Sequence, residues 1–221
     1  MGTGTYLIEE LQKLRHDILT MATRVEENLG NALVALKTGN KELVKKVRED
    51  DLIVDALQLK IEDDAAYVIA TQHPVAGDLR ELVAIFKLTG NIERVGDHAV
   101  HLAKAAKKLA KKTESPIRAQ ESLEKMAETG KVMFRAAINA FISQDTKAAR
   151  EAAAIDNIID EEHGALTEDI LKLMKKNPDL VKSAMQILHT SNQLERLGDH
   201  ITNICEAIIY MIEGKREELN D

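Results

Sequence analysis

Pairs of acidic side chains recur at four-residue spacing in this sequence. One helical turn separates the members of each pair, so both carboxylates lie on the same stripe of a helix. Like charges at this spacing destabilise an isolated helix by a few tenths of a kcal/mol, roughly, so their repetition needs an explanation. The pairs are Asp51 with Asp55, Glu93 with Asp97, Asp156 with Asp160, and Glu195 with Asp199.

A bound cation would compensate the repulsion within these pairs. Hard metals that prefer oxygen ligands, such as Mg²⁺, Mn²⁺, Ca²⁺ or ferric iron, suit a carboxylate cluster with little sulfur or imidazole. The alternative is that the pairs are solvated surface acids neutralised by Arg94, Arg196 or nearby lysines. For one pair alone the second explanation is favoured, whereas the repetition of the pattern favours metal binding.

The carboxylate pairs belong to an internal repeat. The segment NIERVGDHAV (91–100) matches QLERLGDHIT (193–202) at an offset of 102, and DLIVD (51–55) matches DNIID (156–160) at an offset of 105. A period of about a hundred residues is too long for the common solenoid repeats. The sequence therefore predicts an all-α protein of two tandem three-helix bundles related by duplication, with domains at 1–113 and 114–221.

Apolar residues at three- and four-residue spacing predict six long helices. The three prolines lie where this periodicity breaks, and Gly39, Asn40 and Asp145 or Ser143 supply end and cap residues. The predicted helices are Tyr6–Lys37, Lys41–Ala70, Val75–Lys112, Pro116–Ile142, Thr146–Lys176 and Pro178–Glu213.

The helical stripes also predict how the carboxylates are oriented. Apolar residues such as Leu197 and Ile201 fall on the arc opposite Glu195 and Asp199, so we expect the acids to face away from the bundle interior. Gly96 and Gly198 each cost about 1 kcal/mol in mid-helix relative to alanine. We expect them to allow the close approach of a neighbouring helix, or to leave room for a metal beside Asp97 and Asp199. We interpret His98 and His200 as packing or capping residues.

Composition excludes several classes of function. The chain has 221 residues, 44% of them apolar and 3% aromatic, and a formal net charge of −7, which disfavours sequence-general nucleic-acid binding. Cys205 is the single cysteine, so an intrachain disulfide and a multi-cysteine zinc site are excluded. We find neither a signal peptide nor an apolar run approaching the ~20 residues that span a bilayer, and we expect a cytoplasmic protein without membrane insertion.

Motifs of common enzymes are also missing. A ferritin-like di-iron centre needs a Glu-x-x-His step, which does not occur, and the nearest approach is Asp160 with His163. Gly-rich phosphate loops and a G-x-S-x-G elbow are absent as well. Nucleotide hydrolysis and acyl transfer therefore lack their usual residues, while a metalloenzyme that holds two cations and a metal store remain the alternatives.

Two segments of the sequence closely resemble the PhoU family of phosphate-uptake regulators. They are HPVAGDLRELVAIFKLTGNIERVGDHAVHLA (73–103) and LERLGDHITNICEAIIYMIEG (194–214), and the resemblance extends over essentially the whole chain. It implies paired three-helix bundles that bind metal, often as multinuclear iron clusters. The ligands that it implies are Asp51, Asp55, Glu93 and Asp97 in the first half, and Asp156, Asp160, Glu195 and Asp199 in the second.

The same resemblance implies a regulatory function. Members of the family are thought to exert negative control of the phosphate-starvation response by coupling a PstSCAB-type phosphate ABC transporter to a PhoR-type sensor histidine kinase. On this resemblance we expect an adaptor with structural or sensory metals and not an enzyme. Helix-bundle proteins often associate through spare apolar stripes, so we also expect a homodimer.

Overall fold

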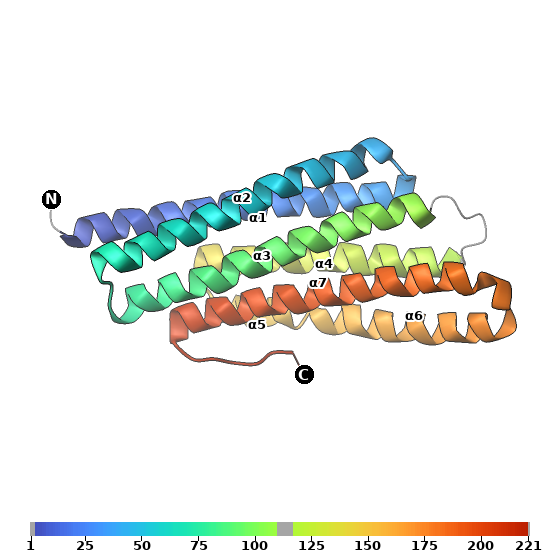
Figure 1. Ribbon diagram of the computed structural model, residues 1–221. Coiled ribbons are helices and arrows are strands. Elements are labelled where there is room, and N and C mark those ends of the chain that lie inside the picture. Colours follow the sequence, from blue (N-terminus) through green and yellow to red (C-terminus); the bar gives the residue numbers. More distant parts are fainter. Residues whose placement is uncertain (1–2, 110–116, 221) are drawn as a thin grey trace.

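The computed structural model describes residues 3–109 and 117–220, and these ranges are almost entirely helical (Figure 1). No strand occurs within them. The helices are α1 (Thr3–Thr38), α2 (Lys41–Gln72), α3 (Ala76–Leu109), α4 (Ile117–Ser143), α5 (Thr146–Ala153), α6 (Asp156–Lys176), the 3₁₀ turn η1 (Pro178–Leu180) and α7 (Val181–Glu213).

The helices form two bundles that lie side by side. In the first bundle, α1, α2 and α3 pack against one another. In the second, α4 and α7 pack against each other, and both contact the consecutive helices α5 and α6. Helix α3 makes its most extensive contact with α7, and α1 also touches α4, so the bundles share one long interface (Figure 1). This confirms the predicted pair of tandem three-helix bundles. The predicted domain boundary between residues 113 and 114 lies outside the described ranges.

Local cap chemistry sets several helix ends. The side chain of Asn40 accepts hydrogen bonds from the amides of Glu42 and Leu43 at the start of α2, as predicted. Asp145 caps α5 in the same way, so of the two predicted cap residues, Ser143 and Asp145, the second is the N-cap. Gly214 ends α7 at φ 73°, in the left-handed region that glycine adopts without strain.

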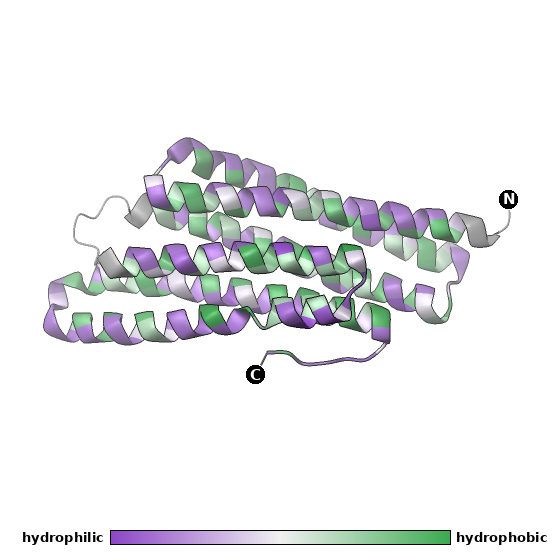
Figure 2. Ribbon diagram, turned by 180° about the vertical axis from the view of Figure 1, so that it is seen from behind, coloured by the Kyte–Doolittle hydropathy of each residue, from purple (hydrophilic) through white to green (hydrophobic). Residues whose placement is uncertain are grey.

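The core is apolar along the full length of both bundles. Hydrophobic and hydrophilic bands recur along the helices (Figure 2), as expected where apolar residues return every three or four positions. Phe134, Met21 and Ile85 are among the largest side chains with no exposed area. In the described part of the chain, no helix combines the length and the hydrophobicity needed to cross a membrane.

The fifth helix differs from the prediction because it is divided in two. The chain leaves α5 after Ala153 and begins α6 at Asp156, through a turn in which the Ile155 amide bonds the carbonyl of Ala152. The side chain of Asn157 donates to the Ala154 carbonyl at 3.3 Å. An asparagine side chain that bonds the local backbone competes with a continuous helix, which explains why periodicity alone missed the break.

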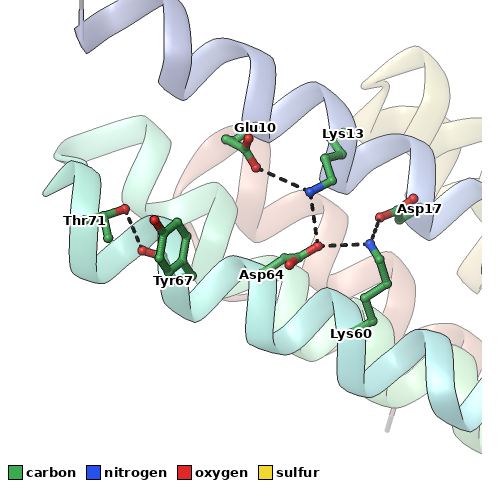
Figure 3. Close-up of polar contacts among 7 residues, drawn as sticks. All are labelled: Glu10, Lys13, Asp17, Lys60, Asp64, Tyr67 and Thr71. Carbon is green, nitrogen blue, oxygen red and sulfur yellow. Dashed lines mark hydrogen bonds and ion pairs between the residues drawn. The ribbon is translucent and has the colours of Figure 1, made fainter.

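A polar network joins α1 to α2 at the surface (Figure 3). Lys60 Nζ lies 2.6 Å from the Asp17 carboxylate and 3.0 Å from that of Asp64. Lys13 Nζ approaches Asp64 at 3.4 Å from the α1 side. Exposed ion pairs of this kind contribute about 0–1 kcal/mol each, so the network helps to align the two helices while the apolar core supplies most of the stability.

The cap of α2 gives a test of the local structure. We expect Asn40→Ala to lower the free energy of unfolding by about 1 kcal/mol, because two amides of the first turn lose their acceptor, and Asn40→Asp to restore most of it. Urea denaturation followed by circular dichroism measures both, with the exposed neighbour Lys41→Ala as control. Equal stability of Asn40→Ala and the control would contradict the assigned cap.

Candidate metal centres

The predicted ligands form two sets that occupy equivalent places in the two bundles. Each set combines one carboxylate pair from the middle helix of a bundle with another pair from its last helix. We call them the first and second carboxylate sets. The first consists of Asp51 and Asp55 on α2 with Glu93 and Asp97 on α3, and the second of Asp156 and Asp160 on α6 with Glu195 and Asp199 on α7.

A glycine directly before the second acid of the α3 pair, and another before that of the α7 pair, accommodates an aspartate from the neighbouring helix. A Cβ atom built on Gly198 would lie 2.0 Å from Asp156 Oδ1 and 3.3 Å from the end of Ile159. A Cβ atom on Gly96 would lie 3.3 Å from Asp51 Oδ1. The mid-helix glycines therefore allow the close helix approach that the sequence predicted, and the space they leave holds the first aspartate of the opposing pair.

The carboxylates are less exposed than predicted. Asp156 is buried, with 7% of its surface exposed, and Asp51 is half-buried. The Oδ1 atom of each is buried without a hydrogen-bond partner, whereas Asp156 Oδ2 accepts from the Thr202 hydroxyl at 3.1 Å. The prediction of an outer face was wrong for these two residues because the glycines open the helix interface to them.

Burial and mutual repulsion disfavour ionisation of the first set. Burial, followed by the charges of Asp55 and Asp97, raises the pKa of Asp51 to about 6. Burial and the charge of Asp97 raise the pKa of Glu93 to about 7, against the opposing effect of Arg94. The pKa of Asp55 is raised for the same reasons. This set therefore holds negative charge at a cost that a cation would remove.

The second set shows the same electrostatics. Burial, with the charge of Asp160 next, raises the pKa of Asp156 to about 7 although the Thr202 hydroxyl opposes the shift. Burial likewise raises the pKa values of Asp160, Glu195 and Asp199. The duplication has thus preserved the unfavourable charge environment as well as the residue types.

The chemical type of the donor atoms fits a hard cation. Both sets offer only carboxylate oxygens, and each includes a buried oxygen that lacks a hydrogen-bond donor, as a metal ligand would before coordination. Within residues 3–109 and 117–220, however, no three His, Cys, Asp or Glu side chains are already drawn together in metal-binding geometry. A cation would therefore have to draw the carboxylates inward by side-chain rotation.

Arginine neutralises part of the first set. Arg94 contacts the Asp97 carboxylate at 2.8 Å and that of Glu93 at 3.4 Å, and its own side chain is 57% exposed. This is the pairing that the alternative explanation of the sequence named. It accounts for Asp97 and Glu93 and leaves the buried oxygen of Asp51 without a partner.

The repeated histidines have a structural role at the interface between the bundles. His98 Nδ1 lies 3.1 Å from Gln193 Oε1, and His200 Nδ1 lies 3.0 Å from Asn91 Oδ1, so one repeat supplies the amide for the histidine of the other. The two rings are 5.4 Å apart. Burial lowers the pKa of His98 to about 4, so it is neutral at pH 7. The interpretation of both as packing residues agrees with these contacts.

Sequence reasoning missed two components beside the second set. A cavity of about 340 Å³ is lined by its four carboxylates together with His163 and the C-terminal residues Leu219 and Asn220. The Leu219 amide donates to Glu206 at 2.8 Å, which fixes the end of the chain over this cavity. The nearness of His163 to Asp160 in sequence was a usable signal, but nothing local indicates where the terminal segment folds.

Comparison with known proteins places this geometry in a family. The model of the PhoU domain matches the chain twice, at residues 18–106 and 123–208, and each match contains one carboxylate set. A protein from Clostridium acetobutylicum is 31% identical, with 96% of each chain covered. A protein from Aquifex aeolicus is 33% identical over 95% of this chain and 94% of its own. Both are named as homologues of the phosphate-specific transport system accessory protein PhoU.

Solved structures agree with these matches. The crystal structure of PhoU from Pseudomonas aeruginosa superposes with a TM-score of 0.89 at 29% identity, covering 94% of this chain and 99% of that one. The crystal structure of the phosphate transport system regulatory protein PhoU from Streptococcus pneumoniae superposes with a TM-score of 0.85 at 30% identity, covering 96% of this chain and 99% of that one.

The two glycines should respond differently to a methyl group. Alanine improves helix propensity by about 1 kcal/mol at either position. At Gly198 the new Cβ would displace the buried Asp156, so we expect Gly198→Ala to destabilise the protein by about 1–2 kcal/mol net, and Gly96→Ala to change stability by less than about 1 kcal/mol. Chemical denaturation measures both. A Gly198→Ala protein more stable than the parent would refute the packing of Asp156 on this glycine.

Ionisation of Asp156 should lower stability as the pH rises. Its folded pKa of about 7 exceeds its ordinary value of 3.8, so the stability contributed by its protonated form is full below about pH 4 and is lost as the pH rises through 7. We expect Asp156→Asn, which stays neutral, to gain about 1–3 kcal/mol relative to the parent between pH 5 and 8 in chelator-treated protein. Thermal melts at both pH values measure this, with the exposed Asp63→Asn as control; a pH-independent difference would contradict it.

Proposed function

Because the chain belongs to the PhoU family, we propose that it is a negative regulator of phosphate uptake and of phosphate-starvation signalling. The observation that supports this most is the double match of the family model over most of the chain. The matched relatives are named as accessory proteins of the phosphate-specific transport system. In this proposal the chain is a cytoplasmic adaptor between a PstSCAB-type phosphate ABC transporter and a PhoR-type sensor histidine kinase.

The two carboxylate sets would bind the metal in this adaptor. The first set would use the free oxygen of Asp51, and the second that of Asp156, together with the paired acids of the following helix. A cation would neutralise carboxylates whose pKa values are raised by burial and would tie two helices of each bundle together. Iron, manganese and magnesium all accept such oxygen ligands.

An exposed apolar stripe on α2 supports self-association. Leu52 is 67% exposed and Leu59, two turns further, is 62% exposed; Ile53 and, about two turns beyond Leu59, Tyr67 are exposed on the same helix. Apolar residues that continue along one exposed helix face are typical of protein interfaces. In the proposed homodimer, the stripes of two copies pack against each other.

Metal binding is tested by elemental analysis of protein purified without a nickel column or chelator. We expect stoichiometric metal in the parent, loss from one set in Glu93→Ala/Asp97→Ala, and loss from the other in Glu195→Ala/Asp199→Ala. The control Glu151→Ala/Glu168→Ala removes the same charge from side chains that are 69% and 75% exposed. Parent protein that stays metal-free after reconstitution with iron, manganese and magnesium would exclude the metal sites. Protein that binds metal but no partner protein would favour the alternative function of a metal store.

The dimer is tested by light scattering coupled to size exclusion. We expect Leu52→Glu/Leu59→Glu to convert a dimer into a monomer, because four buried charges would face one another across the stripe. The control Val132→Glu/Ile142→Glu changes residues of similar exposure on α4 and should leave the dimer intact. A monomeric parent at tens of micromolar would refute the proposed dimer.

A further inference from the structure

The duplication has produced two equivalent grooves beside the contact between α3 and α7. We call the first the basic groove, a cavity of about 470 Å³ bordered by His101 and Lys104 of α3 and by Lys182 and His189 of α7. The second, the tail groove, is a cavity of about 440 Å³ bordered by residues of the same two helices at their other ends. At the repeat offset of 102, His101 corresponds to Asn203 of the tail groove, Lys104 to Glu206, and His189 to Lys87.

The tail groove contains a segment of the protein itself. After Gly214 the chain turns back without helical structure, and Arg216, Glu217 and Glu218 line the cavity. The Arg216 guanidinium lies 5.6 Å from the centre of the Tyr210 ring, and the Leu219 amide donates to Glu206 at 2.8 Å. Arg150 binds Glu217 at 2.7 Å from outside. The space between α3 and α7 therefore accepts a non-helical peptide that is held by side-chain contacts and one backbone hydrogen bond.

The basic groove has diverged in charge from its counterpart. Where Glu206 accepts the tail amide, the basic groove has Lys104, and a second lysine, Lys182, lies across the cavity. None of the residues that line it is acidic, and neither lysine makes an ion pair with a described residue, although Lys104 is near enough to Asp51 for its charge to lower the pKa of that carboxyl. In a chain with a net charge of −7, this grouping of basic side chains is an electrostatic exception that attracts carboxylates.

The floor of the basic groove suits a peptide better than a small ion. Met185, 54% exposed, and Ala105 provide apolar surface, and an unbranched methionine adapts to varied side chains. Gln193 Oε1 is already bonded by His101 at 2.8 Å, which fixes one wall. A simple anion would use the charges and leave this apolar surface unused.

We propose that the basic groove binds a short, non-helical acidic peptide of a partner protein, as the tail groove binds the C-terminal segment of this chain. The assignment of the peptide to a partner rests on the proposed adaptor function. The binding itself does not depend on metal, so it is measured on the isolated, chelator-treated protein. Failure of peptide binding would thus leave the metal sites and the dimer untouched.

The probe is a fluorescein-labelled pentapeptide with the sequence of residues 217–221, Glu-Glu-Leu-Asn-Asp, titrated with full-length protein by fluorescence anisotropy. We expect saturable binding that weakens at least tenfold in Lys182→Glu, because one cationic side of the groove is reversed, and similarly in Lys104→Glu. Lys147→Glu makes the same charge change on a side chain that is 84% exposed on α5, and we expect an effect below twofold. Lys182 is distant in sequence from both carboxylate sets, so its effect is separable from theirs.

Three outcomes would overturn the proposal. The first is no saturable binding up to millimolar protein, and the second is equal weakening by Lys182→Glu and Lys147→Glu, which would indicate non-specific charge attraction. The third is complete displacement of the peptide by about 1 mM inorganic phosphate at constant ionic strength, which would identify a small-anion site instead. Resistance to phosphate together with sensitivity to Met185→Glu would support the peptide site.

Discussion

The packing of α3 on α7 is the constraint on which the rest of the structure depends. It joins the two bundles through histidines that each take an amide partner from the opposite repeat, His98 with Gln193 and His200 with Asn91. A polar contact of this kind is directional, so it sets the register of the two helices where apolar packing alone would allow sliding. The same register leaves the grooves at either end of the interface, while the other sides of α3 and α7 carry Gly96 and Gly198 against the aspartates of their own bundles.

The carboxylate sets combine two opposing requirements. A buried oxygen without a donor, as on Asp51 and Asp156, costs free energy unless a ligand satisfies it, and several neighbouring acids raise that cost. Proteins retain such costs mainly where a ligand offsets them, which is why raised pKa values cluster at functional sites. Cations offset part of this cost in both sets: Arg94 pairs with Asp97 in the first, and the charge of Arg196 lowers the pKa values of Glu195 and Asp199 in the second, where Thr202 adds a neutral hydrogen bond to Asp156.

Local and repeated signals in the sequence predicted most of the architecture. Cap residues such as Asn40 and the repeated GDH segments depend on nearby residues or on the duplication, so the helices, the bundles and the membership of both carboxylate sets followed from them. The break before Asp156 was missed because the side-chain contact of Asn157 with the backbone leaves no trace in the apolar pattern. The burial of Asp51 and the fold of the terminal segment were missed because both depend on contacts between distant parts of the chain.

The break between α5 and α6 has a mechanical consequence. Helix α2 runs without interruption for 32 residues, about 48 Å at 1.5 Å per residue, so Asp51 lies within a stiff rod and a displacement at one end is transmitted to the other. Asp156 begins α6 directly after a turn of two residues, so a displacement of α5 reaches the second set across that turn and not along a continuous helix. The two carboxylate sets, equivalent in the repeat, are therefore connected differently to the ends of their bundles: the first through one continuous helix, the second across a turn.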